Sequence, residues 1–283
     1  MKQTVSMITS TLYRTVKPSK PFNPILGETY EGYLCLDLDG KAKLVKEATE
    51  DSPDADVFKV FAEQTSHHPP ISNFLIESKI VRIYGHYELS GNTAGNTYLI
   101  KNQGPCYVHF LDTNQRIRFQ LPDVALSGIL WGSQSLTLST SLLFQDKVND
   151  LKCHISFDSN DGISGAIYKY RPSKLQLDCN VPFSKVGDIS QELMRLKGNW
   201  QKNLIIDGDE VWNIGSVESA RVSKALGSQV IQAQSMPLPN PLPSDCRYRE
   251  DLIWLKRKDI PKAEQWKLYM EEQQRYDEKL RKK

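Results

Sequence analysis

Alternation of apolar and polar side chains is the feature that most restricts how this 283-residue chain can fold. In its clearest instance, Leu136, Leu138, Thr140, Leu142 and Phe144 alternate with Thr137, Ser139 and Ser141. A period of two residues places successive side chains on opposite faces of a β-strand, so one face can be buried. Many such segments at short, regular spacing predict an antiparallel meander, closed as a barrel or stacked as a sandwich.

The predicted secondary structure consists mainly of strands, with helices near both ends of the chain. Strands are predicted at 30–39, 56–62, 74–78, 79–89, 97–102, 106–111, 115–121, 124–131, 135–144, 152–157, 163–170 and 174–180. A further hairpin is predicted at 200–206 and 210–214, with a turn at Asp207-Gly208. Helices are predicted at 1–16, 189–197, 217–226 and 260–282, and the proline-rich segment 236–243 is predicted to be extended.

The composition is typical of a globular protein and gives no sign of a nucleic-acid partner. Hydrophobic residues make up 39% of the chain and charged residues 25%, and the net charge is only +2. The five cysteines are far apart and form no Cys-x-x-Cys pair, so neither a zinc site nor a disulfide framework is indicated. Reduced thiols in the cytosol fit this pattern best.

Any contact with a membrane is expected to be peripheral. No apolar segment approaches the ~18 residues that a transmembrane helix needs. The N-terminus also lacks the apolar segment of a signal peptide. Residues 1–27 carry four basic and no acidic side chains, which suits an anionic surface, but four charges are few and a solvated, positively charged N-terminal arm is the default interpretation.

The octet Glu63–Pro70 reads Glu-Gln-Thr-Ser-His-His-Pro-Pro and is an uncommon string. Pro69 pushes His68 out of the helical region, and the two prolines remove backbone donors, so neither a helix nor a central strand continues through them. His67 and His68 therefore lie on a stiff, non-helical segment. Two neighbouring imidazoles in such a segment can bind a phosphate with little ordering cost, because phosphate favours their cationic form.

Three other readings of the octet remain open from the residues alone. The two histidines can be solvated in a surface turn, as proline-rich stretches often are. A metal site would need a third ligand, and the other histidines are scattered along the chain. A nucleophilic pair of Ser66 and His67 is disfavoured, because adjacent side chains rarely align for proton transfer.

The predicted C-terminal helix carries two stripes of side chains on opposite faces. One stripe is apolar and contains Trp266, Tyr269, Tyr276 and Leu280. The other contains Lys267, Glu271 and Arg275 at intervals of four residues. Periodicity alone predicts that the charged stripe faces water, because solvated charge pairs at this spacing are common.

Three separated motifs, taken together, resemble those of one known family. Glu63–Pro70 is similar to the fingerprint of the oxysterol-binding protein family, whose usual form has Val where this chain has Thr65. Lys20–Thr29, with the sequence Lys-Pro-Phe-Asn-Pro-Ile-Leu-Gly-Glu-Thr, also resembles the family. The third motif is Asp245-Cys246-Arg247-Tyr248-Arg249 with Asp251, followed by Lys267, Glu271 and Arg275 at four-residue intervals. The motifs occur in the family's order across nearly the whole chain.

The resemblance implies a mainly β fold with flanking helices, in one lipid-binding domain over residues 1–283. The implied architecture is a large, near-closed antiparallel β-barrel around a hydrophobic lipid tunnel, followed by C-terminal helices. The implied function is intracellular: binding phosphatidylinositol 4-phosphate and exchanging it between membranes for a sterol or phosphatidylserine. A lipid sensor or adaptor without net transport is the alternative. Neither catalysis nor a cofactor or metal is expected, and the protein is expected to be a cytoplasmic monomer that acts peripherally at membranes or membrane contact sites.

The resemblance also implies roles for individual residues. Lys20 and Asn23 would contact the phosphate and glycerol side of the head group, and His67 and His68 would bind the 4-phosphate. Lys267 and Arg275 would add cationic donors, with Glu271 holding them or accepting a hydrogen bond from an inositol hydroxyl.

The chain departs from the family pattern at its N-terminus. Only 19 residues precede Lys20, so the family's N-terminal lid is expected to be short or missing. Since lid residues contact the second lipid in the family, the choice between sterol and phosphatidylserine stays open. A tunnel without a lid would leave apolar surface exposed to water.

Overall fold

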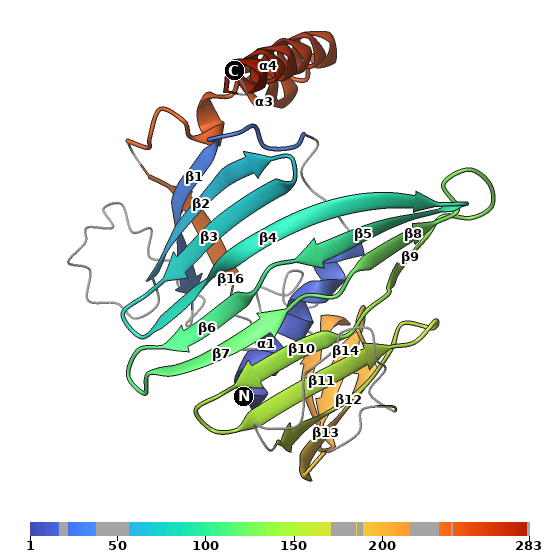
Figure 1. Cartoon of the computed structure of the whole chain (residues 1–283). Helices are drawn as coiled ribbons and strands as arrows, with labels where there is room; N and C mark the ends of the chain where they lie inside the picture. The colour runs from blue at the N-terminus through green and yellow to red at the C-terminus, as the bar shows by residue number, and fades with distance from the viewer. Residues whose placement is uncertain are drawn as a thin grey trace.

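One antiparallel sheet dominates the protein (Figure 1). The computed structural model describes residues 1–16, 22–37, 57–170, 185, 189–215, 232–238 and 240–281. Over these described residues the sheet has sixteen strands, and its main path runs β15-β14-β13-β12-β11-β10-β7-β6-β4-β3-β2-β1-β16. Within the described residues this path ends at β15 and β16, so the curved sheet does not close into a complete ring. The predicted mainly β architecture with C-terminal helices is confirmed.

The elements have the following bounds. The strands are β1 (Thr29–Asp37), β2 (Val57–His67), β3 (Pro70–Glu77), β4 (Val81–Ala94), β5 (Thr97–Gln103), β6 (Cys106–Phe110), β7 (Gln115–Gln120), β8 (Val124–Ser127), β9 (Ser135–Leu138), β10 (Leu142–Asp146), β11 (Leu151–Phe157), β12 (Gly162–Lys169), β13 (Gln191–Asn199), β14 (Asn203–Ile206), β15 (Asp209–Asn213) and β16 (Gln232–Pro237). The helices are α1 (Lys2–Thr11), the 3-10 helix η1 (Leu12–Val16), the 3-10 helix η3 (Cys246–Tyr248), α3 (Glu250–Lys256) and α4 (Ile260–Arg281).

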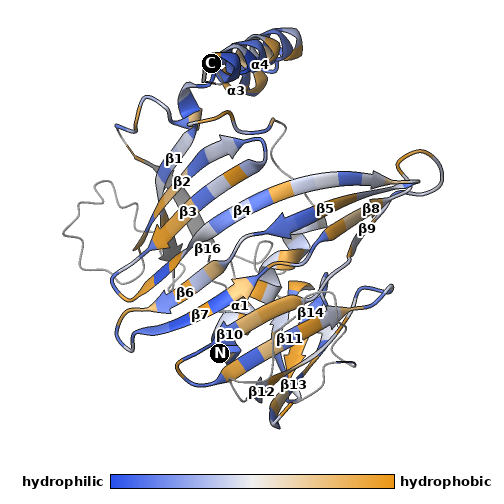
Figure 2. Cartoon of the chain, in the orientation of Figure 1, coloured by the Kyte–Doolittle hydropathy of each residue, from blue (hydrophilic) through white to orange (hydrophobic). Residues whose placement is uncertain are grey.

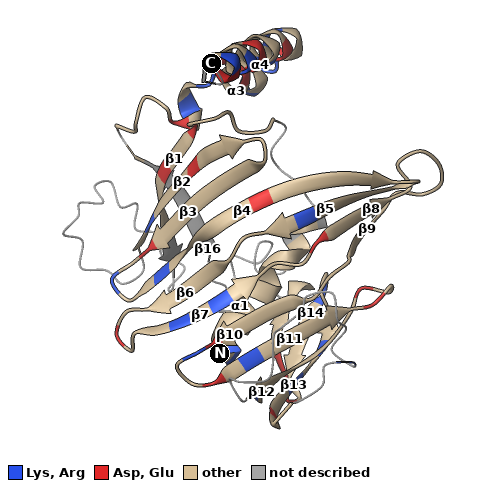
Figure 3. Ribbon diagram, viewed as in Figure 1, with Lys and Arg blue, Asp and Glu red and all other residues tan. Residues whose placement is uncertain are grey.

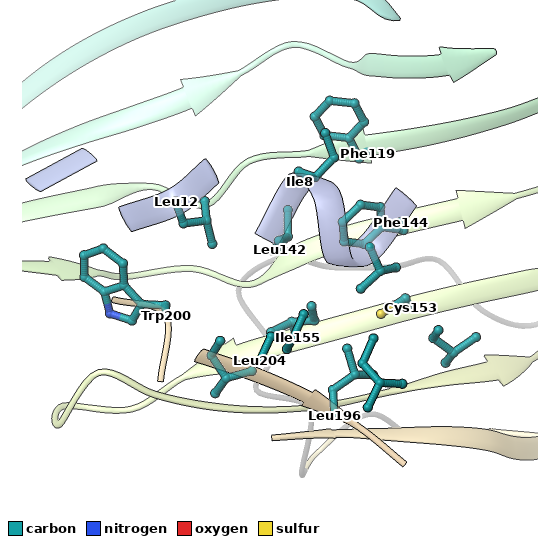
Figure 4. Packing of buried hydrophobic residues seen from close by; sticks show 14 of the residues in the cluster. Ile8, Leu12, Phe119, Leu142, Phe144, Cys153, Ile155, Leu196, Trp200 and Leu204 are labelled. Carbon is teal, nitrogen blue, oxygen red and sulfur yellow. The ribbon is translucent and has the colours of Figure 1, made fainter. Parts of the chain in front are cut away.

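Helix α1 packs on the inner face of the sheet and completes the main core (Figure 4). The buried residues Val5 and Ile8 of α1 and Leu12, the first residue of η1, recur at helical spacing and cluster with side chains from β7 and β10–β14. The strand residues in this cluster include Phe119, Leu142, Phe144, Cys153, Ile155, Leu196 and Leu204. Each large apolar side chain buried here contributes roughly 1.5–3 kcal/mol. The core therefore lies in the half of the sheet that α1 covers.

The inner face of the other half, formed by β2–β4, is only half-buried. Strand register places Phe74, Ile83 and Tyr87 on the same face as the buried Val108. These three side chains are partly exposed, although they adjoin the core, and the rings of Phe74 and Tyr87 stack with centroids 5.0 Å apart. This half of the sheet therefore presents an apolar inner surface that the described residues do not fully cover.

Several predicted elements are confirmed. Helices form near 1–16 and 260–282, as α1 with η1 and as α4. The hairpin of β14 and β15 turns at Asp207 and Gly208, which have φ of 52° and 91°. Positive φ at both central residues is what the tightest two-residue hairpin turn requires. The predicted strand 174–180 and helix 217–226 lie outside the described residues.

The predicted helix at 189–197 is wrong, because this segment forms strand β13 between β12 and β14. Met194 and the buried Leu196 face the core, while Arg195 and Lys197 are exposed. Leu196 fits a helical stripe together with Leu193 and a strand face together with Met194, and pairing with β12 and β14 selects the strand.

Two other predicted segments differ in detail. Residues 135–144 form two strands, because Ser139 N donates to Asp123 O (2.9 Å) and Asp123 N donates to Thr140 Oγ1 (2.7 Å). These bonds separate β9, which pairs with β8, from β10, which pairs with β7 and β11. The first part of the predicted proline-rich segment is strand β16, which pairs with β1.

None of the helices in the described part of the chain combines the length and the apolar composition that crossing a bilayer requires.

Candidate functional site

A cavity of about 640 Å³ lies between the loop before β1, the β2–β3 hairpin and helix α4. Its lining comprises Phe22, Asn23, Pro24, Ile25, Leu26, Thr65, Ser66, His67, His68, Arg249, Lys267, Met270, Glu271, Gln274, Arg275 and Glu278. Segments separated by more than 200 residues thus meet at one place.

The β2–β3 hairpin directs the octet toward this cavity. Strand β2 ends at His67, and no strand continues through the turn at His68 and Pro69, as predicted, but Pro70 is the first residue of β3 and pairs with His67. The pairing register shifts between Gln64 and Ser66, which makes Thr65 a β-bulge. The bulge is held by the buried Gln64, whose Nε2 donates to Ser66 O at 2.6 Å. Bulges redirect side chains, and this one turns Ser66 and the residues after it toward α4.

The two histidines lie against each other at the cavity wall. Their ring centroids are 4.6 Å apart, with an edge-to-face angle of 67°. Nδ1 of His67 is buried and has no hydrogen-bond partner among the described residues. Burial lowers the pKa of His67, the neighbouring His68 lowers it further, and Glu271 and Glu278 act in the opposite direction. A bound anion would both pair with the free nitrogen and favour the imidazolium.

The lowered pKa of His67 predicts that stability decreases in acid. The unfolded chain takes up the imidazole proton first as the pH falls below about 6.5, and this favours unfolding. The His67→Gln variant should therefore lose less unfolding free energy than the wild type between about pH 7.5 and about pH 5. Urea denaturation at both pH values checks this, and equal losses in the two proteins would contradict it.

The loop before β1 is fastened to the octet through main-chain hydrogen bonds. Gly27 N donates to Gln64 O at 2.8 Å, and Gln64 N donates to Glu28 O at 2.9 Å. Gly27 has a φ of 79°, which glycine adopts without strain. Asn23 and Phe22 are thereby held at the cavity rim.

Arg249 joins this loop to the C-terminal helices through a buried ion cluster. Its Nη1 donates to Glu28 Oε2 at 2.6 Å and to Asn23 O at 2.9 Å. Its Nε and Nη2 donate to Asp251 at 3.0 and 2.5 Å. Burial opposes the charge on Arg249, but the carboxylates of Asp251 and Glu28 raise its pKa overall. The side chains of Arg249, Glu28 and Asp251 are 6%, 4% and 0% exposed, so water screens this cluster weakly.

Asp245 ties strand β1 to the same region. Its carboxylate accepts hydrogen bonds from Glu31 N at 3.1 Å and from Arg247 N at 2.9 Å. The Arg247 side chain also donates to Asp245, and Thr29 N donates to Ser244 O at 3.0 Å. The motif at 245–251 thus supports the cavity, and only its Arg249 lines it.

Helix α4 presents its charged stripe to the cavity. The Glu271 carboxylate lies 3.6 Å from Lys267 Nζ and 3.5 Å from Arg275 Nη2. This charged face lies opposite the β2–β3 hairpin across the cavity, as the resemblance implied. The side chains of Lys267, Glu271 and Arg275 are still 39%, 37% and 68% exposed, so the stripe also contacts water, as periodicity predicts. The stripe of Trp266, Tyr269, Tyr276 and Leu280 points outward and is 36%, 52%, 59% and 51% exposed.

The structure brings together six of the seven predicted site residues. Asn23, His67, His68, Lys267, Glu271 and Arg275 all line the cavity. Lys20 lies outside the described residues. Within the described part of the chain, no three His, Cys, Asp or Glu side chains are grouped to hold a metal ion.

Sequence reasoning missed two polar residues of the lining, Gln274 and Glu278. Both follow from helical geometry, since they lie seven residues after Lys267 and Glu271 and so share their face. Nε2 of Gln274 is buried without a hydrogen-bond partner among the described residues. Among the described lining residues, Glu271 and Glu278 offset the charges of Lys267 and Arg275, and Arg249 is paired with Glu28 and Asp251.

The family model described as oxysterol-binding protein matches residues 1–283. The chain belongs to the oxysterol-binding protein family. The resemblance predicted from the three motifs is therefore confirmed.

Two similar relatives are longer than this chain. Oxysterol-binding protein 9 of Dictyostelium discoideum is 30% identical over an alignment of 297 residues that includes 99% of this chain and 61% of the relative. Oxysterol-binding protein 12 of the same organism is 28% identical, over 66% of this chain and 44% of the relative. The chain thus spans about three fifths or less of these two proteins.

Solved structures of oxysterol-binding proteins share the fold. The Osh3 ORD from Saccharomyces cerevisiae in complex with PI(4)P is 20% identical, with a TM-score of 0.65 over 98% of this chain and 68% of that one. The Osh1 ORD domain in complex with ergosterol is 22% identical, with a TM-score of 0.66 over 99% of this chain and 66% of that one.

Proposed function

We propose that this protein binds phosphatidylinositol 4-phosphate in the cavity and exchanges it between membranes for a second lipid, a sterol or phosphatidylserine. The observation that carries the proposal is the meeting of Asn23, the two histidines and the charged face of α4 around one cavity. The PI(4)P and ergosterol named with the related Osh3 and Osh1 structures support the choice of ligands. Lys20 keeps its proposed role beside Asn23.

The proposed head-group contacts follow from the chemistry of the lining. His67 and His68 bind the 4-phosphate, for which the unpaired Nδ1 of His67 is a ready donor when protonated. Arg275 offers two parallel donors to a phosphate, and Lys267 offers a single point of charge. Glu271 lies within 3.6 Å of both cations and orients them or accepts from an inositol hydroxyl.

The half-buried inner face of β2–β4 is the proposed site for the acyl chains. Phe74, Ile83 and Tyr87 lie there with partial exposure, and the hairpin that carries the histidines joins β2 to β3. Burial of each methylene contributes about 0.8 kcal/mol, so a chain of ~16 carbons can offset much of the cost of leaving a bilayer. The head group would then remain at the cavity, where polar groups select it.

The two lipids are expected to compete, because the proposal places them in one site. Excess phosphatidylinositol 4-phosphate in acceptor vesicles should displace the second lipid and drive it out of the protein. A fluorescence assay of transfer between donor and acceptor vesicles, with mass spectrometry of the lipids that co-purify, measures both steps. Simultaneous occupancy would exclude exchange.

The same transfer assay separates a transporter from a sensor or adaptor. Rapid binding without movement of lipid from donor to acceptor vesicles would favour the sensor.

No catalytic step is part of the proposal, and release of phosphate from phosphatidylinositol 4-phosphate would contradict it. The proposed place of action is the cytoplasmic surface of membranes or their contact sites, where a monomer binds peripherally.

A further inference from the structure

The ends of strands β4, β5, β8 and β9 project beyond the β2–β3 hairpin. Together they form what we term the β-finger, residues 89–100 and 124–138. Strand β4 pairs with β3 only as far as Glu88, opposite Ile71, and its last residues pair with β5 alone. Strand β5 pairs in turn with β8, and β8 with β9. Residues 89–94 extend the finger by about 20 Å, at the same end of the sheet as the β2–β3 hairpin (Figure 1).

The tip of the β-finger exposes large apolar side chains. Leu130 and Trp131, in the loop between β8 and β9, are 67% and 66% exposed. Tyr98, close to the turn between β4 and β5, is 38% exposed, and Leu89, at the base of the finger, is 42% exposed. Figure 2 shows hydrophobic colour in the loop beyond the end of β8. Single exposed apolar residues are common on proteins, but a projecting group of them indicates an interaction site.

Hydrogen bonds hold the loop in this exposed conformation. Asn96, in the turn between β4 and β5, accepts from Leu130 N at 2.8 Å through Oδ1 and donates to Trp131 O at 2.8 Å through Nδ2. Gly128 N also donates to Asn96 O at 3.0 Å. Gly128 has a φ of 77°, which favours glycine at this position. The apolar pair is therefore presented by a preorganised turn.

The β-finger carries no charge near its tip. Charged residues make up 25% of the chain, yet residues 89–100 and 124–145 contain no Asp, Glu, Lys or Arg. Figure 3 shows the end of β4 and the loop beyond β8 without acidic or basic residues. Transfer of a charge into a medium of low polarity is costly. A tip without charged side chains can therefore insert among lipid head groups and acyl chains at lower cost.

We propose that the tip of the β-finger docks on the surface of a lipid bilayer, with Leu130 and Trp131 inserted into its interfacial region. Tryptophan is enriched at that depth in membrane proteins. Two projecting side chains cover far less than the roughly 800 Å² per partner that a stable protein interface buries. An uncharged tip also needs no anionic lipid. The inference adds a docking surface to the proposed function, and docking would bring the end of the sheet that carries His67 toward the membrane.

The test is flotation of the full chain with phosphatidylcholine vesicles that contain no phosphoinositide, so that the result does not depend on the head-group cavity. The double variant Leu130→Ser/Trp131→Ser should bind at least about tenfold more weakly than the wild type. The matched control is Val148→Ser, in the turn between β10 and β11, because Val148 is likewise 67% exposed. The control should bind as the wild type does, and binding should not change between about 0.1 and about 0.5 M salt.

Three results would overturn the proposal. The wild type could fail to float, or the double variant could float as well as the wild type with an unchanged melting temperature. A wild-type dimer in light scattering that the double variant converts to a monomer would instead assign the tip to a second copy of the chain.

Discussion

Replacing His67 and His68 together with alanine is expected to abolish binding of phosphatidylinositol 4-phosphate while leaving the fold intact. Hydrogen bonds to a charged phosphate contribute roughly 1.5–3 kcal/mol each, so losing two should lower the affinity about a hundredfold or more. The fold should survive, because His68 is exposed and Nδ1 of His67 has no partner among the described residues that would be left unsatisfied. Titration with vesicles containing the lipid measures the affinity.

The control for this variant is a histidine outside the cavity. His109 on β6 makes a hydrogen bond of 2.9 Å between Nε2 and Asn114 Oδ1 and does not line the site. The His109→Ala variant should bind the lipid as the wild type does. Unchanged affinity in the double histidine variant, with near-ultraviolet circular dichroism like that of the wild type, would remove the phosphate-binding role of the octet.

Alternation predicted the sheet well because each inward residue must be apolar wherever one face is buried. It was weakest where a segment satisfied two periods at once. Leu193 and Leu196 fit a helical stripe, but Met194 and Leu196 fit a strand, and hydrogen bonds to β12 and β14 selected the strand. Such pairing partners lie far along the chain, so a local pattern cannot identify them.

The site was predicted from motifs, and the sequence could not supply the interactions that assemble it. Periodicity predicted that Lys267, Glu271 and Arg275 contact water, which they do in part, but it could not show that this face of α4 borders the cavity. The contact between Arg249 and Glu28 spans 221 residues and leaves no local signal. Motif residues that do not line the cavity, such as Asp245, hold the segments that do.

The order of the cavity therefore depends on the buried ion cluster of Arg249, Glu28 and Asp251, which joins the segments that line it. The loop of Asn23, the start of β1 and the beginning of α3 all converge on Arg249. Head-group affinity and folding stability should be coupled through this one side chain, because the groups it holds lie on both sides of the site.

Replacing Arg249 with alanine is accordingly expected to lower the free energy of unfolding by about 3–5 kcal/mol, because breaking a buried ion cluster leaves carboxylates buried without their cation. The side chains of Glu28 and Asp251 are only 4% and 0% exposed, so water solvates these carboxylates poorly. Urea denaturation gives the free energy. Phosphoinositide affinity should fall as well, since Asn23 O loses its donor.

Two further variants decide whether the charge is the cause. Arg195→Ala removes an ion pair with Glu192 in which the arginine is 72% exposed, and it should change stability little. Combining Arg249→Met with Glu28→Gln and Asp251→Asn should recover part of the loss, because no buried charge is then left unpaired. An Arg249→Ala protein as stable as the Arg195→Ala protein would show that this cluster does not hold the cavity together.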